Sequence, residues 1–228
     1  MLTENVRTEI ARLRARRTGH FDLAKVFLND PRQLKLDILA HAVLKRSLCL
    51  LRGFCDLVES RNMISAIPLM RCQLDNGLRF FASSLVDNPH DLAESVVKGT
   101  LLNRQKDRDG NLMTDAHLAR KLTTEAPWAK SLYDQACGYV HLSEHHIINT
   151  IGIPDEDGTI TIGITEWDGE IWTETLYLQA IEAFDASTSL VLEILEMWAK
   201  VRVQELQRFP MFSPGTGPSG NGGKPVNR

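Results

Sequence analysis

Two charged residues four positions apart, Arg71 and Asp75, stand in an otherwise apolar helical pattern, PLMRCQLDNGLRFF. Apolar residues recur around them at three- and four-residue steps, as on the buried face of a helix: Ile67, Leu74, Leu78, Phe81 and Leu85. A guanidinium on that face needs a polar or charged partner, and a carboxylate four residues away is within reach. Guanidinium groups also bind phosphates and carboxylates through paired hydrogen bonds, so this pair could hold an anion.

A second segment, SLYDQACGYVHLSEHHI, carries four polar or reactive side chains at four-residue intervals: Tyr133, Cys137, His141 and His145. On a continuous helix these side chains share one face. Small residues at 136–138 would let another helix approach closely, and the helix that carries Arg71 is the natural neighbour. We therefore expect one cleft lined by four candidate site residues: Arg71, Asp75, Tyr133 and His141.

This expected cleft has two interpretations. In an acid–base or phosphate-handling site, His141 would exchange a proton near neutral pH and Arg71 would bind the anion. Asp75 would orient Arg71, and Tyr133 would donate a hydrogen bond. In a structural network, the same groups would satisfy one another and fix the register of the two helices. The sequence favours the structural network, because such networks often give this pattern.

Two other chemistries start from the second segment. His141 and His145 form an HxxxH pattern that suits zinc, and Glu144 or a remote carboxylate could be a third ligand. Leu142, however, stands where an HExxH motif has its glutamate. Cys137 stands four residues before His141, a spacing that rarely gives a nucleophile good geometry. Phosphate-binding and dinucleotide-binding glycine motifs are absent. We therefore expect no metal and no other cofactor.

Charge is distributed unevenly along the chain. The net charge of the 228 residues is −3, but residues 1–60 carry 11 Lys/Arg against 7 Asp/Glu, a net of +4. Residues 151–200 carry 1 Lys/Arg against 11 Asp/Glu, a net of −10. The arm RTEIARLRARR could contact RNA or DNA phosphates, but it lacks interleaved aromatic residues. A solvated face or a dimer contact with the acidic portion is the favoured expectation for this arm. The basic and acidic portions could also pair within one chain.

Cysteine usage and hydropathy indicate a cytoplasmic protein. The four cysteines form no CxxC motif and lie in apolar, helix-like runs, which is typical of reduced, buried thiols. The first 17 residues are charged throughout, unlike a secretory signal. No run approaches the roughly 20 apolar residues that a membrane span needs.

The periodicity predicts an all-α bundle of about six or seven helices. We expect helices over about 3–17, 31–60, 63–86, 88–102, 114–124, from 127 through 140, and 174–208, with an exposed loop at 103–113. Alternating residues around Asp168-Gly169 predict a small β-hairpin at about 158–174. Residues 1–212 are expected to form one helical domain, and the Gly/Pro/Ser-rich residues 213–228 a disordered tail.

Residues 60–145 resemble the DUF5677-like helical proteins of bacteria. The resemblance rests on the Arg71-x-x-x-Asp75 pair and on the segment from Tyr133 to His141. The resemblance implies a helical fold. It implies no activity, because none is established for that family. A more distant resemblance is to HEPN domains, helical dimers that often act as metal-independent ribonucleases in toxin and phage-defence systems. Their mark is an arginine followed by a histidine after four to six residues. Arg14 and His20 fit this spacing, although Gly19 predicts a turn between them.

We therefore expect an interaction or sensor module with a polar Arg/Asp/Tyr/His cleft. The alternative is a HEPN-like hydrolase directed at RNA or nucleotides. The expected partners are a second copy of the chain in a homodimer, and RNA or a small anionic ligand. No membrane is expected as a partner.

Overall fold

The computed structural model describes residues 1–151, 156–160, 162–169 and 171–208. This part of the chain is mainly helical, which confirms the all-α class. Its helices are α1 (Glu4–Ala15), α2 (Arg17–Leu28), α3 (Lys35–Glu59), α4 (Met63–Phe81), α5 (Pro89–Val97), α6 (Asp115–Leu122), α7 (Ala129–Val140), α8 (Glu144–Thr150) and α9 (Glu174–Arg208). Two short 3-10 helices are Ala82–Leu85 and Leu102–Arg104. Within the described ranges, no helix is long and apolar enough to cross a membrane.

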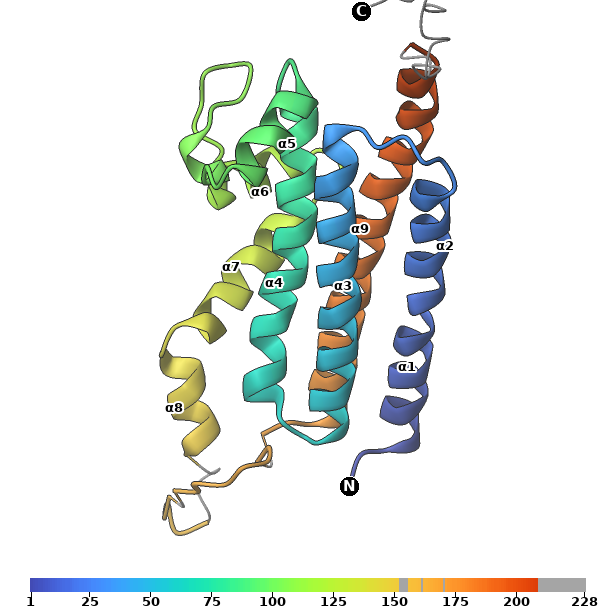
Figure 1. Cartoon of the computed structure of the whole chain (residues 1–228). Helices are drawn as coiled ribbons and strands as arrows, with labels where there is room; N and C mark the ends of the chain where they lie inside the picture. Colours follow the sequence, from blue (N-terminus) through green and yellow to red (C-terminus); the bar gives the residue numbers. More distant parts are fainter. Residues whose placement is uncertain (152–155, 161, 170, 209–228) are drawn as a thin grey trace, which may run out of the picture.

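The long helices lie side by side as a bundle. Figure 1 shows α1 and α2 following one another along one side, with α3, α4 and α9 beside them. On the other side of the bundle, α7 packs against α4, and α8 continues from it toward the end of the molecule that holds the N-terminus. The α5 and α6 helices lie at the opposite end, against α3 and α4 respectively.

Several helices begin where the sequence places a capping residue. The side chains of Asn62, Asn88 and Thr114 accept hydrogen bonds from backbone N–H groups in the first turns of α4, α5 and α6. Because α4 begins at Met63, Pro68 lies inside this helix. Local capping therefore sets where these three helices begin, close to the starts at about 63, 88 and 114 that the sequence predicts.

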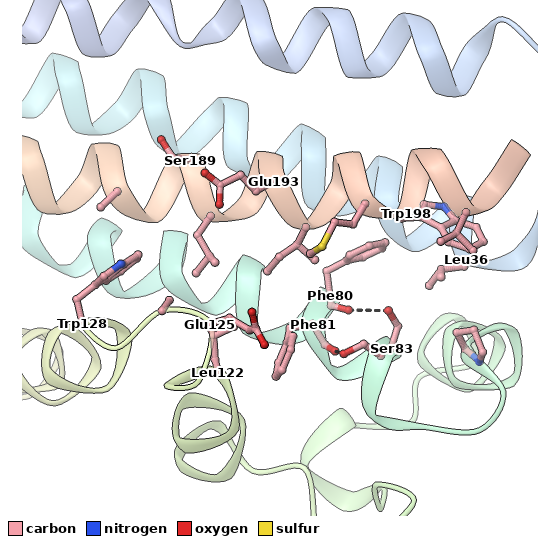
Figure 2. A pocket seen from close by; sticks show the side chains of 18 residues that line it. Leu36, Phe80, Phe81, Ser83, Leu122, Glu125, Trp128, Ser189, Glu193 and Trp198 are labelled. Carbon is pink, nitrogen blue, oxygen red and sulfur yellow. Dashed lines mark hydrogen bonds between the residues drawn. The ribbon is translucent and has the colours of Figure 1, made fainter.

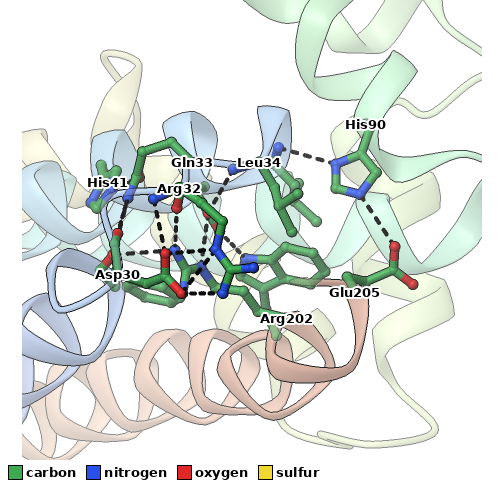
Figure 3. A network of polar contacts seen from close by, with 12 residues as sticks. Asp30, Arg32, Gln33, Leu34, His41, His90, Arg202 and Glu205 are labelled. Atoms are coloured by element: carbon green, nitrogen blue, oxygen red, sulfur yellow. Dashed lines mark hydrogen bonds and ion pairs between the residues drawn. The ribbon is translucent and has the colours of Figure 1, made fainter. Parts of the chain in front are cut away.

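The expected start of a helix at Asp30-Pro31 is wrong. The Asp30 side chain accepts hydrogen bonds from the Arg32 backbone and guanidinium, each at 2.9 Å, and α3 begins only at Lys35. Arg202 on α9 donates to the Arg32 carbonyl over 2.8 Å, which pins this connection to the last helix (Figure 3). The tertiary contact between Arg202 and Arg32 thus decides that the Asp30-Pro31 pair does not begin a helix.

The sequence prediction also missed α2. A single residue, Arg16, separates α1 from α2, and Gly19 lies inside α2 and not in a turn. A Cβ atom added at Gly19 would lie 3.2 Å from Leu192 Cδ1, so this glycine lets α2 approach α9 closely. Its absent side chain serves helix packing.

The apolar core forms two clusters along the bundle. One contains Phe27 and Phe80, and the other contains Phe54 stacked on Phe184 with ring centroids 4.0 Å apart. A buried polar layer, defined here as His20, Ser47, Gln73 and Thr188, lies between the two clusters. Both clusters have residues on α3, α4 and α9, and on each of these helices one member of the layer separates them; His20 lies between the cluster residues of α1 and those of α2. Its members are joined by hydrogen bonds: the Gln73 amide donates to Ser47 Oγ (2.7 Å) and Thr188 Oγ1 (3.0 Å).

The expected β-hairpin is not seen. No strand occurs in the described residues of 158–174; an isolated bridge links Ile151 to Ile162 instead. Asp168 is buried rather than in an exposed turn, and its carboxylate accepts from the Met63 backbone N–H (2.8 Å) and the Tyr177 hydroxyl (2.5 Å). The segment is therefore anchored at the start of α4, and this tertiary contact takes the place of cross-strand pairing.

The basic arm pairs with acidic residues of the same chain. Arg16 makes two hydrogen bonds to Asp185 on α9, at 2.7 and 2.9 Å, and Arg14 lies 2.8 Å from Glu59. One of the expected arrangements, pairing within the chain, is thus present. The single-domain assignment of residues 1–212 stays a prediction, and the proposed tail, 213–228, lies outside the described residues.

Candidate functional site

The structure brings the four predicted site residues together. They line one cleft of about 370 Å³ formed by side chains from α3, α4, α6 and α7 and by the residue that follows α7. Its lining residues are Arg46, Arg71, Cys72, Asp75, Asp115, Tyr133, Cys137, Val140 and His141. The four side chains predicted to share a cleft therefore do so, although His141 reaches it from the residue after α7 and not from the helix itself.

Arg71 is the central cation of this cleft. Its side chain is 12% exposed, its Nη2 donates to Asp115 Oδ2 over 2.8 Å, and its guanidinium carbon lies 4.2 Å from the centre of the Tyr133 ring. Burial lowers the pKa of Arg71, but Cys137, Tyr133 and the two carboxylates outweigh this effect, so the net shift is upward. The guanidinium is charged and held in place by contacts on two sides.

Asp75 plays a different part from the one expected. Its Oδ1 lies 3.9 Å from Arg71 Nη1, whereas Arg79 Nε donates to Oδ1 and Arg46 Nη1 donates to Oδ2, both over 2.9 Å. The main carboxylate partner of Arg71 is Asp115. Asp75 therefore chiefly holds the two flanking arginines.

Asp115 and Arg46 are the residues that sequence reasoning missed. Asp115 follows the Thr114 cap, and an acidic residue in a first helical turn is common enough to attract no attention. Its Oδ1 also lies 2.5 Å from Arg79 Nη2, an ion pair whose angles fall outside those of a hydrogen bond. Arg46 lies on the polar side of α3, where an exposed arginine is the ordinary expectation.

The second segment does not form one continuous helix. The α7 helix ends at Val140, and His141 follows in an extended conformation (φ −110°, ψ 148°) with an exposed ring at the cleft. His145 belongs to α8, where its ring stacks on Tyr139 with centroids 4.6 Å apart. The expected stripe of four side chains is therefore broken after Val140.

This break separates the two histidines of the HxxxH pattern. His141 lies at the cleft, while His145 packs against Gly138 and Tyr139 between α7 and α8. Among the described residues, no group of three or more His, Cys, Asp or Glu side chains is arranged to hold a metal ion. Gly138 makes room for His145, rather than for α4 as its small size had suggested.

Tyr133 forms the aromatic wall of the cleft. Burial raises the pKa of its hydroxyl, and the positive charge of Arg71 only partly opposes this effect. The phenol therefore stays protonated around neutral pH and keeps a hydrogen that it can donate to a ligand.

The cleft is connected to the polar layer of the core. Arg46 Nη1 donates to Asn76 Oδ1 over 2.6 Å, and Asn76 Nδ2 donates to Gln73 Oε1 over 3.1 Å. Gln73 in turn bonds Ser47 and Thr188. A chain of hydrogen bonds thus runs from the cleft through α4 to α3 and α9.

The HEPN-like spacing of Arg14 and His20 does not form a joint site. Arg14 lies on α1, where it pairs with Asp56 and Glu59. His20 lies on α2, is 1% exposed, and contacts Ser47. The two side chains therefore serve different contacts.

Comparison with known proteins adds no relative. No family model matches the chain, and neither a curated protein nor a solved structure matches it. The resemblances to DUF5677-like proteins and HEPN domains stay predictions from the residues quoted above.

Proposed function

We propose that this protein is an interaction or sensor module whose polar cleft binds a small anion. The charge count carries this proposal: three guanidinium groups, from Arg46, Arg71 and Arg79, meet two carboxylates, from Asp75 and Asp115. The cluster is only partly exposed, so its excess positive charge is less screened than on an open surface. A phosphate or carboxylate of matching size would balance it.

Arg46 offers the free binding capacity. Both of its hydrogen bonds to described residues use Nη1, and 45% of its side chain is exposed. Its Nε and Nη2 groups therefore have donors available for a ligand at the mouth of the cleft. Arg71 supplies fixed charge, and Tyr133 supplies a hydroxyl.

The connection to the core supports a sensing role. An anion that draws Arg46 away from Asp75 and Asn76 would disturb the hydrogen-bond chain that reaches Gln73. That chain contacts α3 and α9. Ligand binding at the cleft would thereby change the relative stability of different packing arrangements of the helices. Coupling between two sites requires such a change.

Isothermal titration of the full chain with inorganic phosphate and with adenosine monophosphate tests this function. We expect Arg46→Gln to weaken binding about tenfold or more, since it removes a charge-assisted contact. Arg52→Gln is the matched control, because Arg52 is also on α3 but is 84% exposed and lies 3.5 Å from Asp56. The proposal fails if the wild type binds neither anion at millimolar concentration, or if both variants bind equally well.

The alternative is a hydrolase that acts on RNA or nucleotides. One observation favours it: the exposed ring of His141 lines the same cleft as Arg71, so a base and a phosphate-binding cation share one site. Against it, no hydrogen-bond partner among the described residues fixes the His141 ring. Cleavage of single-stranded RNA by the wild type, lost in His141→Ala at unchanged melting temperature, would favour the hydrolase over the binding module.

A further inference from the structure

A second, larger cavity lies elsewhere on the molecule. It has a volume of about 840 Å³ and shares no lining residue with the polar cleft. Figure 2 shows α9 along one side of it, with the end of α4 and the segment after α6 on the other. Anion binding at the polar cleft therefore assigns no role to this cavity.

Its walls are mainly apolar and aromatic. Rings from both sides face it: Phe80, Phe81, Trp128 and Trp198. Met197 and Val201 on the α9 side are 56% and 47% exposed, so apolar surface at this cavity is open to water. A concave site that leaves such side chains open to water is typical of a ligand-binding pocket.

The ionisable side chains that line this cavity are two carboxylates, Glu125 and Glu193. They stand on opposite sides, one after α6 and the other on α9 (Figure 2). Neither carboxylate forms a hydrogen bond or ion pair with another described residue. Arg16 interacts electrostatically with Glu193, but its guanidinium is bonded to Asp185. The cavity therefore combines an apolar interior with a negatively charged ionisable lining, in which Arg16 offsets only part of the charge of Glu193.

We infer that this cavity binds a hydrophobic organic cation, a molecule in which aromatic or alkyl groups surround one positive charge. The faces of Phe and Trp rings attract a cation that is removed from water. Glu125 and Glu193 add direct charge attraction, which is stronger beside an apolar wall than in bulk water. A neutral apolar ligand would lack this attraction, and an anion would be repelled.

Two ions of the same shape and opposite charge provide the test. We would titrate the full chain by calorimetry with tetraphenylphosphonium and, separately, with tetraphenylborate. Because the cavity's ionisable lining residues are acidic, the phosphonium ion should bind and the borate ion should bind at least about tenfold more weakly. Equal affinity for the two ions would show that apolar burial alone governs binding, and would overturn the inference.

Substitutions assign the binding to this cavity. The double variant Glu125→Gln/Glu193→Gln keeps the shape of both side chains, and we expect it to weaken phosphonium binding roughly tenfold or more. Glu196→Gln, also exposed on α9 but outside the lining, is the matched control and should bind as the wild type does. Unchanged binding in the double variant would overturn the inference.

A second copy of the chain is the competing occupant. If light scattering shows a dimer that Met197→Glu converts to a monomer, and the wild type binds neither ion at millimolar concentration, the inference is overturned in favour of a self-association face. Failure of phosphate to bind at Arg46 has no bearing on this outcome, since the two sites share no residue.

Discussion

At the scale of single residues, Asp37 carries the most demanding electrostatic role in the core. Its side chain is fully buried and accepts from the Leu34 backbone N–H (2.9 Å), Trp198 Nε1 (2.9 Å) and Arg202 Nε (2.8 Å). Arg202 is itself only 3% exposed. The carboxylate therefore caps α3 and neutralises a buried guanidinium of α9 at once.

We expect Asp37→Asn to lower the free energy of unfolding by about 3–5 kcal/mol, because it leaves the Arg202 charge buried and unbalanced. Urea denaturation at pH 7 measures this loss. Asp22→Asn is the control, since Asp22 pairs with Lys25 at an exposed site and such pairs contribute about 0–1 kcal/mol. A loss below about 1 kcal/mol for Asp37→Asn would contradict this role.

His20 gives the core a dependence on pH. Its Nδ1–H donates to the Arg16 carbonyl (3.1 Å) and its Nε2 accepts from the Ser47 hydroxyl (2.8 Å), so the bonds fit the neutral ring. Burial lowers the pKa of His20 below its usual value of about 6.5. The unfolded chain then binds a proton at higher pH than the folded chain does.

The consequence is a loss of stability in mild acid. As pH falls below about 6.5, the unfolded state gains a proton that the folded state still excludes, so the free energy of unfolding decreases. In His20→Gln this contribution should vanish, making the free energy less dependent on pH between 7 and 5. Urea midpoints at a series of pH values test this difference, and equal pH slopes for both proteins would refute it.

At the scale of elements, Gly138 allows α8 to fold back on α7. A Cβ atom added at this position would lie 2.8 Å from His145 Cδ2. The Ser143 hydroxyl also donates to the Gly138 carbonyl over 2.6 Å, which fixes the turn between the two helices. A side chain at residue 138 would therefore force His145 off the Tyr139 ring.

We expect Gly138→Ala to speed amide hydrogen exchange across α8 while leaving α3 and α4 unaffected, because this close contact is one of those that hold α8 against α7. The double variant Gly138→Ala/His145→Ala removes the clash and should restore slow exchange in part. A substitution of Ala136, on the same helix, is not a suitable comparison, because this residue is buried in the core. Unchanged exchange in Gly138→Ala would mean that α8 is held by other contacts.

At the scale of the whole molecule, the polar layer divides the bundle into two apolar clusters. Gln73 contacts Ser47 on α3, Thr188 on α9 and Asn76 on its own helix. Sliding any of these helices by one turn would leave a buried amide without partners. The layer therefore fixes the register in which the long helices pack.

Replacement of Gln73 by leucine should lower the free energy of unfolding by about 1–3 kcal/mol, because it leaves buried partners without a hydrogen bond. Gln135→Leu on the exposed face of α7 is the control and should change little. Urea denaturation followed by circular dichroism gives both values. If Gln73→Leu is as stable as the wild type, apolar packing alone sets the register.

The oligomeric state is also a property of the whole molecule. The described chain pairs Arg12 and Arg16 with Asp185 internally, so these charges are already matched within one copy. A homodimer stays a prediction from a long helix and the charge asymmetry of the sequence, with light scattering of the full chain as its measurement.

The sequence by itself determined what depends on neighbouring residues. Asn62, Asn88 and Thr114 cap helices because each needs to reach N–H groups only two or three residues away. The three- and four-residue steps around Arg71 likewise placed it on an inward-facing side of α4, because helical periodicity is a local property. The all-α class follows from such local signals.

Only the tertiary structure decided which partners these residues meet. Arg71 pairs with Asp115, 44 positions away, and Arg46 meets Asp75, 29 positions away. Asp168 became an anchor because the start of α4 offered it an unpaired N–H group. Such choices depend on which helices lie side by side, and no spacing within one segment specifies that arrangement.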